Sequence, residues 1–135
     1  MKLQIGYQEL EAMILEKTKQ SVTLRYVDDK TIVLGKEIKV LFSKKMVEVR
    51  LEVEKIEGTD LFLAYHAGLG LELMAKGMMV FLKDELGGIV EDKGGQTLLV
   101  HLDNVEKLKK PLASVDISCV SFNPQAVNVE FSLKK

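Results

Sequence analysis

The sequence has very little cysteine, no long apolar run and almost no net charge, and each shortage argues against a class of protein. One cysteine among 135 residues, Cys119, allows no internal disulfide, and no Cys/His pattern has zinc-site spacing. The first nine residues lack the apolar core of a secretory signal, and no apolar run approaches the ~20 residues that cross a bilayer. Nineteen basic and twenty acidic residues give a net charge of −1, which would not concentrate nucleic acid. We therefore predict a cytoplasmic protein with no metal, no nucleic-acid partner and no transmembrane segment.

Catalytic patterns are also missing. No serine lies in a Gly-x-Ser-x-Gly elbow. His66 and His101 lie on predicted strands without a Cys, Asp or Glu at ligand spacing, which favours ordinary sheet histidines over a base or ligand, although the two could meet across strands. Cys119 alternates with Val115 and Ile117, which predicts a small buried residue and not a reactive thiol. We predict no catalytic residue and no cofactor, and therefore not an enzyme.

Two short segments resemble phosphate-binding features. Gly68-Leu69-Gly70 lies between a predicted strand and a predicted helix, but Leu73 occupies the third glycine position of a dinucleotide-binding loop. A flexible joint is the favoured interpretation. The lysines of residues 107–110 fall in the last turn of a predicted helix, where cations favour the negative end of the helix dipole. Neither segment predicts an anion site.

Length and composition predict one folded domain over residues 1–135, because 47% hydrophobic and 29% charged residues suffice for a core. Apolar residues alternate with polar ones over most of the chain, as in strands. Helical spacing appears at residues 7–17, where Leu10, Met13 and Ile14 share one face, and at residues 70–86; a shorter helix starts at Asp103 and is limited by Pro111. We predict an α+β fold: a strongly curved antiparallel sheet of hairpins with one long apolar helix and two short helices.

The predicted long helix is apolar on more than one face. Met79 and Val80 interrupt the charged stripe of Glu72, Lys76 and Lys83. Flexible, polarizable methionines can fill a core or line an adaptable cleft, and core packing is the commoner use. The candidate ligand-binding residues on this helix are Leu71, Met74, Met78, Met79, Phe81 and Leu82.

The arrangement resembles the tubular lipid-binding, or BPI-like, superfamily. The resemblance rests on the strands of 47–65, the helix of 71–86, the segment Leu98-Leu99-Val100-His101-Leu102-Asp103 and the closing hairpin of 115–133. It implies an apolar ligand held between a long helix and a curved sheet. Members of that superfamily usually have longer domains, often secreted or membrane-linked. A shortened relative is expected to cover the surplus helix surface by pairing two copies.

Together these observations predict a non-enzymatic binding module. It is expected to be a homodimer that holds a lipid or other apolar small molecule between the helix of 70–86 and the concave sheet. The alternative is a structural or scaffolding subunit that uses the same helix surface for homo- or hetero-oligomeric assembly.

Overall fold

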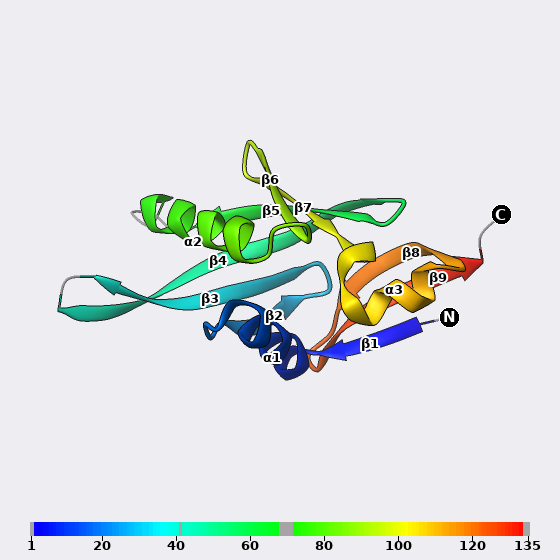
Figure 1. Cartoon of the computed structure of the whole chain (residues 1–135), viewed down its shortest axis with the longest axis horizontal. Coiled ribbons are helices and arrows are strands. Elements are labelled where there is room, and N and C mark those ends of the chain that lie inside the picture. Colours follow the sequence, from blue (N-terminus) through cyan, green and yellow to red (C-terminus); the bar gives the residue numbers. More distant parts are fainter. Residues whose placement is uncertain (1, 41, 68–71, 134–135) are drawn as a thin grey trace.

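The computed structural model describes residues 2–40, 42–67 and 72–133. Figure 1 shows sheets with helices packed against them. The elements are β1 (Lys2–Gly6), α1 (Tyr7–Thr18), β2 (Thr23–Asp28), β3 (Thr31–Val40), β4 (Ser43–Glu57), β5 (Asp60–Ala67), α2 (Glu72–Glu85), β6 (Val90–Gly94), β7 (Thr97–His101), the 3₁₀ turn η1 (Leu102–Asn104), α3 (Glu106–Leu112), β8 (Val115–Phe122) and β9 (Ala126–Leu133).

The strands form two antiparallel sheets. The larger has the order β2-β3-β4-β5-β7-β6, and the smaller has the order β1-β9-β8. Most neighbours in the larger sheet are also neighbours along the chain, as short connections favour. The predicted α+β class and the antiparallel pairing are confirmed.

The predicted strong curvature and long helix are wrong. Within the residues that the structure describes, the strands divide between two sheets, neither of them strongly curved or closed, and the three helices are all short. Helix α2 has 14 residues and ends at Glu85, before Gly87 and Gly88; Gly88 has φ +90°, a left-handed conformation that few other residues adopt. The apolar spacing in the sequence extends to Leu86, which is why the helix was predicted to reach residue 86, but the backbone after Glu85 forms a turn.

The small sheet takes its third strand from β1, which is far from β8 and β9 in the sequence. Lys2 pairs with Glu130 and Gly6 with Ala126, so β1 joins β9 across almost the whole sequence. The closing hairpin thereby acquires its own third strand and does not extend the larger sheet. The sheets also meet directly, since the Phe122 N–H donates to the carbonyl of Asp29, 2.8 Å away, in the β2–β3 turn.

Cys119 is exposed, so the prediction of a buried cysteine is wrong. The register of β8 against β9 shifts between Ile117 and Cys119. The extra residue of this bulge places Ser118 and Cys119 both on the solvent side, while Ile117 and Val120 stay buried.

In the described part of the chain, no helix is long and apolar enough to span a bilayer.

Candidate ligand-binding cavity

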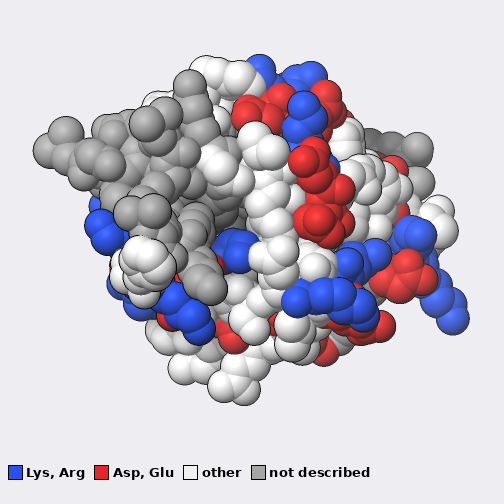
Figure 2. Space-filling view, turned by 60° about the vertical axis from the view of Figure 1, so that its left-hand side comes forward, with Lys and Arg blue, Asp and Glu red and all other residues white. Residues whose placement is uncertain are grey.

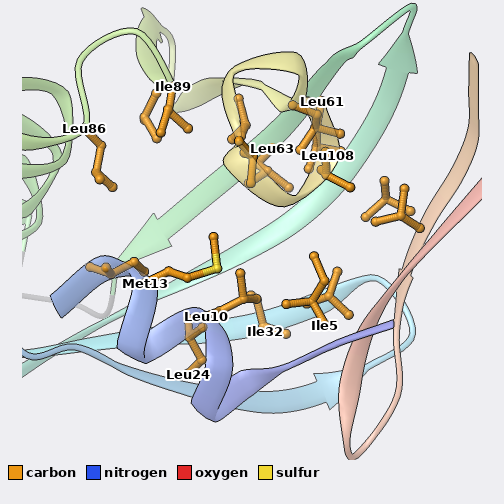
Figure 3. A pocket seen from close by; sticks show the side chains of 18 of the residues that line it. Ile5, Leu10, Met13, Leu24, Ile32, Leu61, Leu63, Leu86, Ile89 and Leu108 are labelled. Carbon is orange, nitrogen blue, oxygen red and sulfur yellow. The ribbon is translucent and has the colours of Figure 1, made fainter. Parts of the chain in front are cut away.

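An apolar cavity of about 230 Å³ lies where the two sheets and the helices meet, and its walls are almost entirely hydrocarbon. In Figure 3, side chains from opposite walls point toward a shared space. Its described lining residues are Ile5, Leu10, Met13, Ile14, Lys17, Leu24, Ile32, Leu61, Leu63, Leu86, Ile89, Val90, Val100, Leu102, Val105, Glu106, Leu108, Val120, Phe122, Val127 and Val129.

Helix α1 forms one wall through the apolar face that the sequence predicts. Leu10, Met13, Ile14 and Lys17 recur at intervals of three and four residues, so they lie along one side of the helix. The three apolar side chains are only half-buried although they face the interior of the fold. They border open space and are not packed as tightly as the surrounding core.

Two long-range hydrogen bonds hold α1 over the sheets. The Glu11 carboxylate accepts from the Leu24 N–H at 2.7 Å, which ties the helix to β2. The buried Tyr7 hydroxyl donates to the Asn123 carbonyl at 2.6 Å, which ties the start of the helix to the β8–β9 turn. Burial, with a smaller contribution from Tyr26, raises the pKa of Tyr7. The wall is therefore fixed at two points and keeps its distance from the sheet.

The larger sheet provides the facing wall because alternate residues of a strand lie on one face. Leu61 and Leu63 on β5 point into the cavity, and Leu61 pairs with Val100 on β7. On β2 and β3, Leu24 and Ile32 continue the lining.

The small sheet and the η1–α3 segment close the remaining sides. Val120 of β8 pairs with Val129 of β9, and both side chains reach the cavity. Leu108 on α3 is only 1% exposed and lines it as well. The Asn104 side chain donates to the Gly88 carbonyl and so connects η1 to the turn after α2.

Two charged residues line the otherwise apolar cavity. Lys17 is exposed at the end of α1, and Glu106 begins α3. Glu106 pairs with Lys109 at 3.3 Å, whereas no described ion pair uses Lys17. The rim can therefore offer a cation to an anionic group whose hydrocarbon part lies inside.

The site residues predicted on the second helix do not form this cavity in the described structure. Leu82 is buried in the core at 4% exposure, and Phe81 is half-buried beneath Lys36, whose ammonium lies 4.9 Å from the ring centre. Leu71 and the side chains of Met74, Met78 and Met79 lie outside the described residues, as does the whole Gly68-Leu69-Gly70 segment. Among the described residues of α2 and the turn that follows it, Leu86 and Ile89 are the ones that line the cavity.

Assembly through the second helix stays a prediction. Val80 on α2 is 56% exposed, so this helix does carry an apolar side chain available for contact. Nothing in the described structure indicates what would cover it.

His101 has partners that sequence spacing did not show. Its Nδ1 lies 3.0 Å from Asp60 Oδ1 on the neighbouring strand, and its Nε2 lies 3.3 Å from Glu91 Oε2. Asp60, His101 and Asp103 place one potential ligand atom each within 4.8 Å of one another. Since both ring nitrogens already contact carboxylates, pairing within the cluster accounts for the arrangement and we assign no metal to it. His66 is exposed at the other end of β5, so the two histidines do not meet.

The cluster predicts a pH-dependent contribution to stability. Hydrogen bonds that the His101 ring donates to the carboxylate of Asp60, and secondarily to that of Glu91, raise the pKa of His101 above its ordinary value despite some desolvation. A raised folded-state pKa means that this stabilisation is fully present below the unfolded value, about 6.5, and is lost as pH rises through the folded value. Asp103 and Lys93, which lies 3.6 Å from Glu91, complete the charged surroundings.

We expect His101→Gln to lower the free energy of unfolding more at about pH 5.5 than at about pH 8.5. Urea unfolding of both proteins at the two pH values measures the difference. The exposed His66 supplies the control variant His66→Gln, which should show no such change with pH. If His101→Gln lowers the free energy of unfolding equally at both pH values, the result would contradict the charge pairing.

The fold and cavity define a class: an α+β protein of two antiparallel sheets with a hydrocarbon-lined cavity between sheets and helices. No protein family, curated protein or solved structure matches the chain.

Proposed function

We infer that the protein is a non-enzymatic cytoplasmic module that binds a hydrocarbon chain in the cavity between α1, α3 and the two sheets. The observation that carries this proposal is the hydrocarbon lining of a cavity of about 230 Å³. Native interiors contain few voids larger than a water molecule, because each void forfeits dispersion contacts. A bound apolar group would restore these contacts.

The volume limits the ligand. An engineered apolar cavity of about 150 Å³ takes up benzene, whereas pockets for drug-sized molecules begin at about 300 Å³. A cavity of about 230 Å³ therefore suits part of a molecule, such as a medium-length acyl chain or a small terpenoid group. Lys17 favours ligands with an anionic head, because it is an exposed residue among those that line the cavity and no described ion pair uses it. Medium-chain fatty acids satisfy both requirements.

A chain-length series tests the proposal. Burial of one methylene contributes about 0.8 kcal/mol, or roughly a fourfold gain in affinity. Unbranched fatty acids of about 4 to 16 carbons should bind with affinity that rises about fourfold per methylene and levels off once the cavity is full. Isothermal titration calorimetry on delipidated protein measures this, with the negative heat-capacity change that accompanies apolar burial. Absence of binding at every length, or affinity independent of length, would exclude the cavity as the binding site.

The resemblance to the BPI-like superfamily contributes only the class of ligand, a lipid, to this proposal. A lipid-binding cavity here would lie between two sheets and short helices and would not need the long helix that the resemblance implies. The described walls of the cavity come from one chain, so the proposed binding does not depend on the pairing of two copies.

A further inference from the structure

The β3–β4 hairpin extends beyond the rest of the sheet. Strands β3 and β4 pair from Thr31–Glu52 out to Val40–Ser43. The pairing of β2 with β3 stops at Gly35, and the pairing of β5 with β4 stops at Val49. The outer half of the hairpin therefore has no described neighbouring strand on either side and projects from the body, at the left in Figure 1.

The tip of this arm combines an apolar residue with lysines. Phe42 is 104% exposed, and Met46 is 53% exposed. Lys44 and Lys45 between them are exposed, and no described ion pair uses either ammonium group. We define the arm tip as Phe42, Lys44, Lys45 and Met46. A fully exposed phenylalanine leaves its apolar surface in water, and covering that surface is favourable.

The charge of the arm differs from that of the chain. Residues 36–46 contain four lysines and one glutamate, a net charge of +3, in a protein whose net charge is −1. Figure 2 shows basic and acidic atoms intermixed over the face that comes forward from the left side of Figure 1, so the positive charge of the arm is a local excess. This local excess would favour the approach of the arm to an anionic surface.

We propose that the arm tip docks on an anionic lipid bilayer, with Phe42 entering the boundary between headgroups and acyl chains and Lys44 and Lys45 contacting lipid phosphates. A projecting tip can reach a flat surface without a clash between that surface and the body of the protein. Basic residues beside an exposed aromatic side chain match an anionic leaflet, which attracts lysines and accommodates rings at its interface. A second copy of this chain would present the same positive charge and is disfavoured.

This docking rests on the proposed function, because a protein that carries hydrocarbon chains must exchange them with a membrane. Membrane docking and fatty-acid binding can be tested independently of each other. Vesicle binding depends on the arm tip, whereas fatty-acid binding depends on the cavity formed by α1, α3 and the two sheets.

Co-sedimentation with vesicles tests the docking. The full-length protein should sediment with vesicles of phosphatidylcholine mixed with phosphatidylglycerol, should not sediment with phosphatidylcholine alone, and should dissociate as salt is raised. Phe42→Ser and the double variant Lys44→Glu/Lys45→Glu should each weaken binding at least tenfold. Both should retain the wild-type fatty-acid affinity.

The other end of the molecule supplies matched controls. Leu133 is 79% exposed on β9, and Lys2 on β1 and Lys110 on α3 are exposed and used by no described ion pair. Leu133→Ser and Lys2→Glu/Lys110→Glu repeat the same kinds of change away from the arm and should leave vesicle binding unchanged. Three results would overturn the proposal: no binding to anionic vesicles, equal loss in the controls, or a Phe42-dependent dimer in sedimentation velocity without vesicle binding.

Discussion

The Met13→Trp variant is expected to lose most of its affinity for fatty acids while it keeps its fold. The Met13 side chain points from α1 into the space between the helix and the sheet (Figure 3). An indole at this position would occupy the room of two to three methylenes, which lowers affinity roughly 15- to 60-fold. Because the ring fills apolar space, we expect the free energy of unfolding to stay equal or to rise. Calorimetric titration and urea unfolding measure the two effects.

Leu15 provides the matched control for this substitution. It lies on the same helix, two residues away, and is 46% exposed. Leu15→Trp should therefore bind fatty acids as the wild type does. If Met13→Trp is stable and binds with unchanged affinity, the ligand does not occupy this cavity.

Local features of the fold were predictable from sequence patterns. The apolar side of α1 at Leu10, Met13 and Ile14 follows from helical spacing, and these residues do line the cavity. The register of β4 against β5 shifts between Val53 and Lys55, close to the point where the alternation of apolar and polar residues changes phase at Ile56. Such features depend on residues close together in sequence, where side-chain period alone determines which face is buried.

Pairing between distant strands was not predictable in the same way. Leu3 and Ile5 alternate as a strand requires, but alternation does not identify a partner, and the partner of Ile5 is Val127. That pairing produces the second sheet, and hence the gap between sheets that becomes the cavity. The predicted binding site was placed on the helix of 70–86 because surplus apolar surface was visible there, whereas a cavity depends on the distances between elements.

The partners of His101 were also not predictable, because they are distant from it in the sequence. Asp60 is 41 positions from His101 in the sequence, yet the two pair directly across β5 and β7. Spacing along the chain therefore indicated no partner. The usable signal was the strand register, since Leu61 opposite Val100 places Asp60 opposite His101.

Replacement of Leu108 by alanine should both destabilise the protein and change the length of chain it prefers. Leu108 is 1% exposed on α3, so its truncation should lower the free energy of unfolding by about 2–5 kcal/mol. The same truncation enlarges the cavity, and the plateau of the chain-length series should move to longer fatty acids. Leu15→Ala, at an exposed position on α1, should change stability by less than about 0.5 kcal/mol and leave the plateau in place. Destabilisation without a shift in the plateau would show that α3 supports the fold but does not form a wall of the binding site.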